Sequence, residues 1–113
     1  MSVSQGVVVV NAGEFKPGHQ WTAGKFSLSF SAAGNLELRD TSSAFLLWQS
    51  GTSGATKLAM QEDGNLVIYQ GYKPLWASGT DGNPNATLRF STNGNIVICS
   101  ASGKLLWDAN VKR

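Results

Sequence analysis

The nine residues Gln61-Glu62-Asp63-Gly64-Asn65-Leu66-Val67-Ile68-Tyr69 decide the fold of this 113-residue chain. They contain a tight turn, because Asp63-Gly64-Asn65 supplies turn chemistry between two β-prone runs at 58–61 and 66–69. Side chains alternate between the two faces of a strand. One face of this hairpin is apolar and is predicted to enter the core: Leu58, Met60, Leu66 and Ile68.

The opposite face of the hairpin combines polar and apolar groups. It carries Gln61, Asn65, Val67 and Tyr69, with Asp63 beside them at the bend. Hydroxyl groups need both donors and acceptors, and ring C–H groups need some apolar surface, so this mixture favours a small polyhydroxylated ligand. An ordinary hairpin with a chance polar face is the alternative interpretation.

The same pattern occurs three times. Gly-Asn followed by Leu or Ile stands at residues 34, 64 and 94, a step of thirty residues. Each copy reads as strand, turn, strand, loop and strand, and ends on a Leu-Trp pair. We predict one domain over 1–113, with repeats at about 26–55, 56–85 and 86–111 and edge strands supplied by 6–24.

The alternating pattern Q-x-D-x-N-x-V-x-Y over 61–69 resembles the mannose-binding motif of the bulb-type (monocot, snowdrop-like) lectins, and Lys-Pro-Leu-Trp-Ala-Ser at 73–78 follows as in that family. The resemblance implies an all-β fold, β-prism II, with three pseudo-symmetric antiparallel sheets around a threefold axis. Three equivalent apolar sheet faces need a common core. Trp48, Trp76 and Trp107 are therefore interpreted as a central cluster rather than as platforms for sugar rings.

The resemblance also implies a function, the recognition of α-mannose or mannose-containing glycans without metal. Asp63 and Asn65 would hold the axial 2-hydroxyl, as acceptor and donor respectively. Gln61 would bond the 3-hydroxyl, Tyr69 the 4-hydroxyl, and Val67 would pack on ring carbons. So shallow a site is expected to bind a monosaccharide only at about millimolar strength. A homodimer, formed in such families by exchange of the C-terminal strand (here 104–111), would add avidity.

The other two repeats have lost parts of this motif. The third is predicted to be a weak or inactive second site, formed by Ser91, Asn93, Asn95 and Val97, with Cys99 in place of the tyrosine. The first is predicted to be abandoned, because only the asparagine survives among Ser31, Ala33, Asn35, Glu37 and Arg39. Glu37 and Arg39 are interpreted there as a plain solvated strand face.

Composition argues against other classes of function. The net charge is +2, with no basic block before Lys112-Arg113, so no nucleic-acid partner is expected. One histidine, His19, and one cysteine, Cys99, offer neither metal-ligand spacing nor a catalytic constellation, so we expect no enzyme, cofactor or metal. Trp21, outside the repeats, is expected to pack rather than bind.

Location and one alternative function stay open. The sequence shows no signal peptide or membrane span, and it lacks the cysteine pair of the plant relatives, so we expect either a cytoplasmic protein or non-classical secretion, without membrane insertion. The alternative function is a β-prism module for protein interaction or defence, toxin-like, with residual sugar binding.

Overall fold

The computed structural model describes residues 7–111, and the predicted bounds at residues 1, 6 and 113, like Lys112-Arg113, lie outside this range. All regular structure within it is β, so it contains no helix that could cross a membrane. The strands are β1 Val7–Val10, β2 Gly13–Phe15, β3 Gln20–Ala23, β4 Phe26–Phe30, β5 Leu36–Asp40, β6 Leu46–Gln49, β7 Lys57–Met60, β8 Leu66–Gln70, β9 Lys73–Ala77, β10 Thr87–Ser91, β11 Ile96–Cys99 and β12 Leu105–Asp108.

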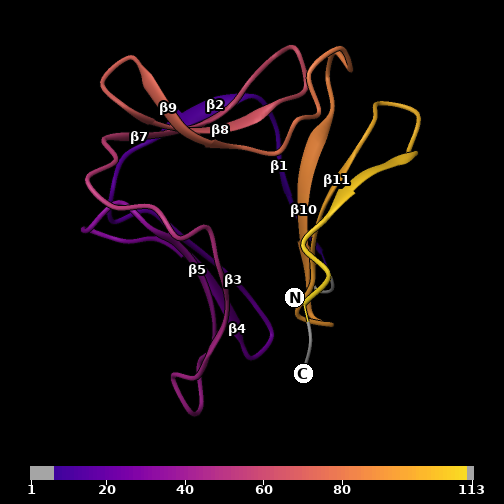
Figure 1. Ribbon diagram of the computed structural model, residues 1–113. Helices are drawn as coiled ribbons and strands as arrows, with labels where there is room; N and C mark the ends of the chain where they lie inside the picture. The colour runs from indigo at the N-terminus through magenta and orange to yellow at the C-terminus, as the bar shows by residue number, and fades with distance from the viewer. Residues whose placement is uncertain (1–6, 112–113) are drawn as a thin grey trace.

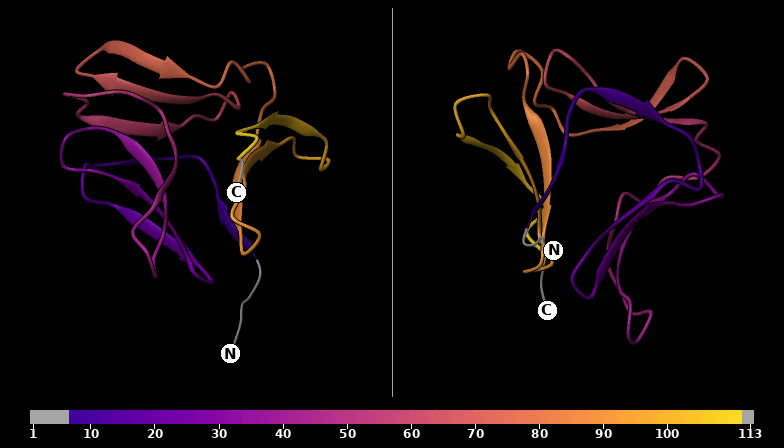
Figure 2. Two further views of the ribbon diagram at one scale, coloured as in Figure 1. Left: turned by 60° about the horizontal axis from the view of Figure 1, so that its bottom comes forward. Right: turned by 180° about the vertical axis from the view of Figure 1, so that it is seen from behind.

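These strands form three antiparallel sheets that face one another around a central axis (Figures 1 and 2). The first sheet has the order β3-β4-β5-β6, the second β2-β7-β8-β9 and the third β1-β10-β11-β12. Each sheet takes three consecutive strands and adds one N-terminal strand at its edge. Because β1 pairs with β10, the beginning of the chain closes the prism against its end. The predicted all-β prism is confirmed.

The three hairpins repeat in their hydrogen bonds. In the second, β7 and β8 pair with Met60 opposite Leu66, and the turn is closed by Gln61 N–H donating to Asn65 O at 2.8 Å. In the other two turns, Ser31 N–H donates to Asn35 O and Ser91 N–H donates to Asn95 O. Each turn contains a glycine with positive φ, at 34, 64 and 94. The sequence repeat is therefore a repeat of backbone geometry.

The apolar faces meet as predicted. Leu58, Met60, Leu66 and Ile68 are buried, together with their counterparts in the other sheets. Trp48, Trp76 and Trp107 contact one another edge to face, with ring centroids 5.6–6.0 Å apart, which confirms the central cluster. These indoles are half-buried, however, and pack against a fully buried layer of Leu, Ile, Phe and Met.

Trp21, which lies outside the repeats, and Cys99, in the third repeat, are both half-buried. Trp21 on β3 is half-buried and packs edge to face on Phe15 and on the exposed His19, at centroid distances of 5.0 and 4.6 Å. The prediction that Trp21 packs is confirmed. Cys99 on β11 is a half-buried free thiol.

Candidate functional site

The residues of the motif gather on the outer face of the second sheet. Gln61, Asp63 and Asn65 lie in the β7–β8 turn, and Val67 and Tyr69 lie on β8. β8 is a central strand, so the site has β7 on one side and β9 on the other. A paired central strand is a rigid support, which favours a preformed site.

Asn65 has two separate roles. Its Oδ1 accepts hydrogen bonds from Gly79 N–H at 3.0 Å, Thr80 N–H at 3.2 Å and the Ser78 hydroxyl at 3.2 Å. These bonds hold the loop that follows β9 against the β7–β8 turn. Its Nδ2 has no partner among residues 7–111 and remains available as a donor toward solvent. The Oδ1 of this amide therefore has a structural role, and its Nδ2 can donate to a ligand.

Asp63 presents a fixed acceptor beside that donor. Its Oδ1 accepts Asn65 N–H at 3.0 Å, and the side chain is exposed. The backbone of the turn is held as well, because Asn83 N–H donates to Asp63 O at 2.9 Å and Asn85 N–H to Glu62 O at 3.1 Å. A carboxylate oxygen and an amide N–H₂ thus lie two residues apart, on either side of Gly64, in an immobilised turn.

Gln61 and Tyr69 form the other side of the site. Gln61 Nε2 donates to Tyr69 Oη at 2.6 Å, which leaves the phenol proton and Gln61 Oε1 for a ligand. Lys57 Nζ lies 5.1 Å from the centre of the Tyr69 ring, within the range of a cation–π contact. Val67 lies on the same face but is only 3% exposed, so it contributes little of the apolar surface expected of it. Tyr69, which is half-buried, has more surface to offer.

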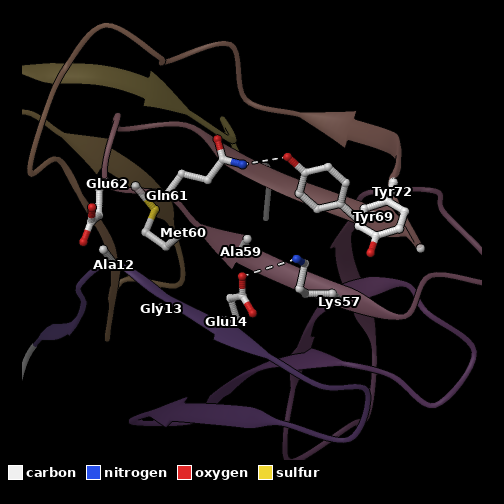
Figure 3. A pocket seen from close by; sticks show the side chains of 11 residues that line it. Ala12, Gly13, Glu14, Lys57, Ala59, Met60, Gln61, Glu62, Tyr69 and Tyr72 are labelled. Carbon is white, nitrogen blue, oxygen red and sulfur yellow. Dashed lines mark hydrogen bonds and ion pairs between the residues drawn. The ribbon is translucent and has the colours of Figure 1, made fainter.

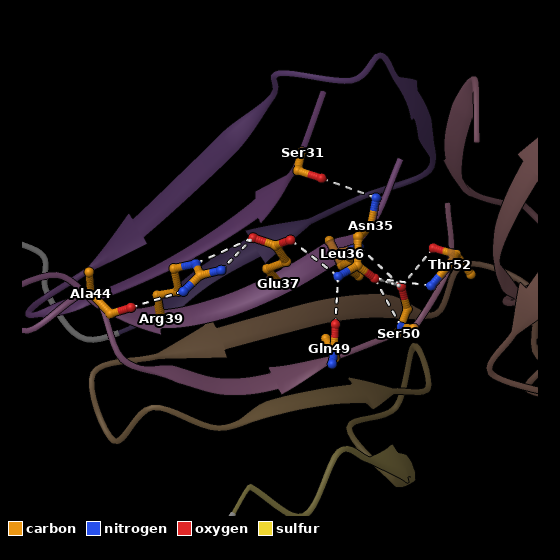
Figure 4. A network of polar contacts seen from close by, with 10 residues as sticks. Ser31, Asn35, Leu36, Glu37, Arg39, Ala44, Gln49, Ser50 and Thr52 are labelled. Carbon is orange, nitrogen blue, oxygen red and sulfur yellow. Dashed lines mark hydrogen bonds and ion pairs between the residues drawn. The ribbon is translucent and has the colours of Figure 1, made fainter. Parts of the chain in front are cut away.

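In the first repeat, the equivalent asparagine, Asn35, has both ends of its side-chain amide bonded within the protein (Figure 4). Asn35 Oδ1 accepts from Gly51 N–H at 2.9 Å and Thr52 N–H at 3.0 Å, as Asn65 does in its own sheet. Here, however, Asn35 Nδ2 donates to Glu37 Oε2 at 3.1 Å and to Gln49 Oε1 at 2.8 Å. The amide therefore has no donor left for a ligand.

Glu37 and Arg39 are not the plain solvated face that the sequence predicted. Glu37 accepts from Asn35 and also forms an ion pair with Arg39 at 3.3 Å, while Arg39 donates to Ala44 O at 2.9 Å. The prediction was wrong because alternation alone does not show which outward side chains bond each other. At the end of β5, hydrogen bonds from Ser42 lower the pKa of Asp40 below its ordinary value, away from this network.

In the third repeat, the amide N–H₂ of Asn95 is also bonded within the protein, here to an aspartate. Asn95 Nδ2 donates to Asp108 Oδ1 at 2.8 Å. Ser91 donates to Asn93, whose Oδ1 also accepts Asn95 N–H at 2.9 Å. The structure thus keeps Ser91, Asn93 and Asn95 together, but their polar groups bond one another.

One position on the third strand of each repeat (β6, β9 and β12) separates these states, and it was not among the residues predicted from the sequence. Gln49, Ala77 and Asp108 pair with Glu37, Val67 and Val97, respectively. Glutamine and aspartate reach the neighbouring asparagine amide, whereas the methyl group of Ala77 cannot. The signal was present in the sequence, as the residue that follows the Trp of each repeat.

Curated lectins match about half of this chain in sequence. A B-type lectin, plumieribetin, of Scorpaena plumieri is 38% identical over 61 residues, covering 54% of this chain and 53% of that protein. A mannose-specific lectin of Aloe arborescens is 38% identical over 60 residues, covering 50% and 53%. The chain thus spans about half the length of the curated relatives it matches. No protein-family model matches it.

Solved structures match over almost the whole chain. A monomeric monocot mannose-binding lectin of Gastrodia elata superposes with a TM-score of 0.77 at 29% identity, covering 94% of this chain and 97% of that one. The snowdrop (Galanthus nivalis) agglutinin in complex with methyl-α-D-mannoside superposes with a TM-score of 0.68 at 28% identity, covering 86% and 91%.

Proposed function

Because this chain is a homologue of the bulb-type mannose-specific lectins and shares their β-prism II fold, we propose that it binds α-mannose or mannose-containing glycans through the second-sheet site. The observation that carries the proposal is the state of three equivalent asparagines. Asn65 Nδ2 has no partner in the described chain, whereas Asn35 and Asn95 donate theirs to protein acceptors. One site per chain is the consequence.

The free groups of the site fit the hydroxyls of mannose. The axial 2-hydroxyl would donate to Asp63 and accept from Asn65 Nδ2, an arrangement that the equatorial 2-hydroxyl of glucose does not match. Gln61 Oε1 would accept from the 3-hydroxyl, and the Tyr69 phenol would donate to the 4-hydroxyl. The Tyr69 ring would cover ring carbons, with only the small exposed part of Val67 beside it. Every contact comes from a protein side chain, so the proposed function is binding without a metal and without catalysis.

Removing the carboxylate tests this assignment. Asp63→Ala should weaken binding of methyl α-mannoside at least tenfold, because a hydrogen bond to a charged group contributes about 1.5–3 kcal/mol. From a starting dissociation constant of about 1 mM, this loss raises the dissociation constant to about 10 mM or more. The measurement is a protein-observed NMR titration in EDTA, with methyl α-glucoside and α-galactoside as sugar controls.

The matched control is Asn93→Ala, which changes the equivalent turn position of the third sheet and should leave the titration unaltered. A titration of Asp63→Ala like that of the parent would refute the site. If the parent itself shows no shifts at tens of millimolar sugar, mannose binding is refuted and a protein-interaction function takes its place.

We further propose that the chain forms a homodimer by exchange of residues 104–111. A single millimolar site gains useful strength only when several are linked. β12 pairs with β11 of its own chain at the outer edge of the third sheet, and Leu105 on it is an exposed apolar residue, so this strand is suited to exchange. Light scattering should give twice the chain mass of 12.0 kDa. A mass of one chain at all concentrations would contradict the exchange.

A further inference from the structure

We propose that the outer face of the third sheet binds the same face of a second copy of this chain. This surface, called the third-sheet face below, points away from the other two sheets (Figure 1). Its outward-pointing apolar side chains are Val7, Val9, Val97, Cys99 and Leu105. Val7, Val9 and Leu105 are 57%, 46% and 54% exposed, respectively. Exposed apolar side chains that gather on one face mark an interaction surface.

The other two sheets have polar or charged residues at the equivalent edge position. The position held by Val9 in the third sheet is Gln20 in the first and Glu14 in the second. Figure 3 shows Glu14 paired with Lys57, 3.3 Å apart, on the second sheet beside the proposed mannose site. The third sheet therefore differs from the others in having an apolar outer face at its N-terminal edge strand.

Two charged side chains on this face indicate that its partner is a second copy. Arg89 on β10 and Asp108 on β12 lie in one row, on either side of Val97 on β11. Arg89 forms no ion pair with any residue that the structure describes. Asp108 Oδ1 accepts hydrogen bonds from Asn95 and Asn110, but its Oδ2 has no partner in the described part of the chain. The face thus offers one cation and one anion to a partner, which is what complementarity to itself requires.

A twofold axis that runs along the middle of the sheet, between β10 and β11, brings these charges together. It places β1 and β10 of one copy over β12 and β11 of the other. Arg89 of each copy then lies one strand spacing, about 4.8 Å, from the position opposite Asp108 of the other copy, a distance that a long side chain spans. Both ion pairs form at once, and Val9 and Leu105 are covered. An axis across the strands would instead bring Arg89 onto Arg89, so the charges select the aligned packing of the two sheets.

The size of the face predicts a reversible association. Its four strands hold four or five residues each. A strand spacing of about 4.8 Å and a rise of about 3.4 Å per residue then give a face of roughly 19 by 15 Å. This is smaller than the interfaces of stable dimers, which bury about 800 Å² on each partner. Association should therefore depend on protein concentration, and the charges of Arg89 and Asp108 should decide whether it occurs.

Sedimentation of the full chain at rising concentration, up to about 1 mM, measures this association. The mean mass of the parent should rise at least twofold. Arg89→Asp and Asp108→Arg each place like charges at both contacts, so each variant alone should keep its dilute mass. An equimolar mixture of the two variants should regain the rise, because every contact then joins opposite charges. Lys73→Asp, which reverses an exposed charge on the second sheet, is the matched control and should behave like the parent.

Val9→Asp provides a second disruption that leaves Asp108 and the core unchanged, because Val9 is exposed on an edge strand. It should also abolish the rise, and it decides the outcome if Asp108→Arg does not fold. A parent of constant mass, a rise that persists in Arg89→Asp, or a mixture of folded variants that does not associate would each refute the contact. Strand exchange would raise the mass of parent and variants alike, so the two modes of association are distinguishable.

Discussion

An Ala77→Asp variant is expected to lose most of its affinity for mannose while it keeps its fold. Ala77 is exposed on β9 and pairs with Val67, at the position where Asp108 pairs with Val97 in the third sheet. A carboxylate at residue 77 should accept a hydrogen bond from Asn65 Nδ2, as Asp108 Oδ1 accepts one from Asn95 Nδ2 at 2.8 Å. The one open amide would then be closed from inside the protein.

The expected loss comes from two effects. A sugar hydroxyl that meets an occupied amide loses its partner, which costs about 1–3 kcal/mol. The new side chain also occupies space beside Asn65 that the sugar would enter. The lost hydrogen bond alone weakens binding by about 5- to 150-fold, which moves a dissociation constant of about 1 mM toward 0.1 M.

The same NMR titration with methyl α-mannoside measures this loss. Ala77→Ser is the matched control, because its short hydroxyl adds no charge and should preserve most of the affinity. Unfolding curves of both variants should match the parent, since residue 77 is exposed. If Ala77→Asp titrates like the parent, the open amide of Asn65 is not what selects the second sheet.

The thirty-residue repeat predicted three equivalent hairpins because it records backbone geometry, and the family resemblance implied their arrangement as a prism. Each Gly-Asn pair forms the same turn, and each Leu-Trp pair reaches the same central cluster. The order in which the N-terminal strands join the sheets, with β1 in the third and β3 in the first, could not be read from the sequence. That order depends on how the chain closes around the axis, and short edge strands carry no pattern that specifies it.

The grouping of the candidate site residues on one sheet face was predictable from the sequence, but which of their polar groups are already bonded within the protein was not. The asparagine at 35, 65 and 95 remains in all three repeats because its Oδ1 holds the loop after the third strand, so its presence does not indicate binding. What differs is whether its Nδ2 donates to a protein acceptor, which depends on the residue that follows the Trp on the neighbouring strand. Motif spacing along one strand does not contain that information, and neither does it show that Val67 is covered.

A Gly64→Ala variant is expected to lose about 2–5 kcal/mol of the free energy of unfolding. Gly64 has φ +96°, a left-handed conformation that costs an L-residue about 1–2 kcal/mol. Its missing Cβ would lie 2.2 Å from Asn83 O and 2.9 Å from Thr80 O, which are backbone atoms that cannot rotate away. Relieving such a clash typically costs another 1–3 kcal/mol or so. Against a total stability of about 5–15 kcal/mol this is a large fraction.

Gly82→Ala separates the two contributions. Gly82 has a similar φ of +85°, but an added Cβ there meets nothing within 4 Å, so only the conformational cost of about 1–2 kcal/mol should appear. Urea unfolding at 25 °C measures both variants. Equal losses would mean that the loop at 80–86 moves aside without cost. A larger loss at Gly64 would show that this loop is packed tightly under the turn, and since Gly64 stands between Asp63 and Asn65, that packing also fixes the two groups proposed to hold the sugar.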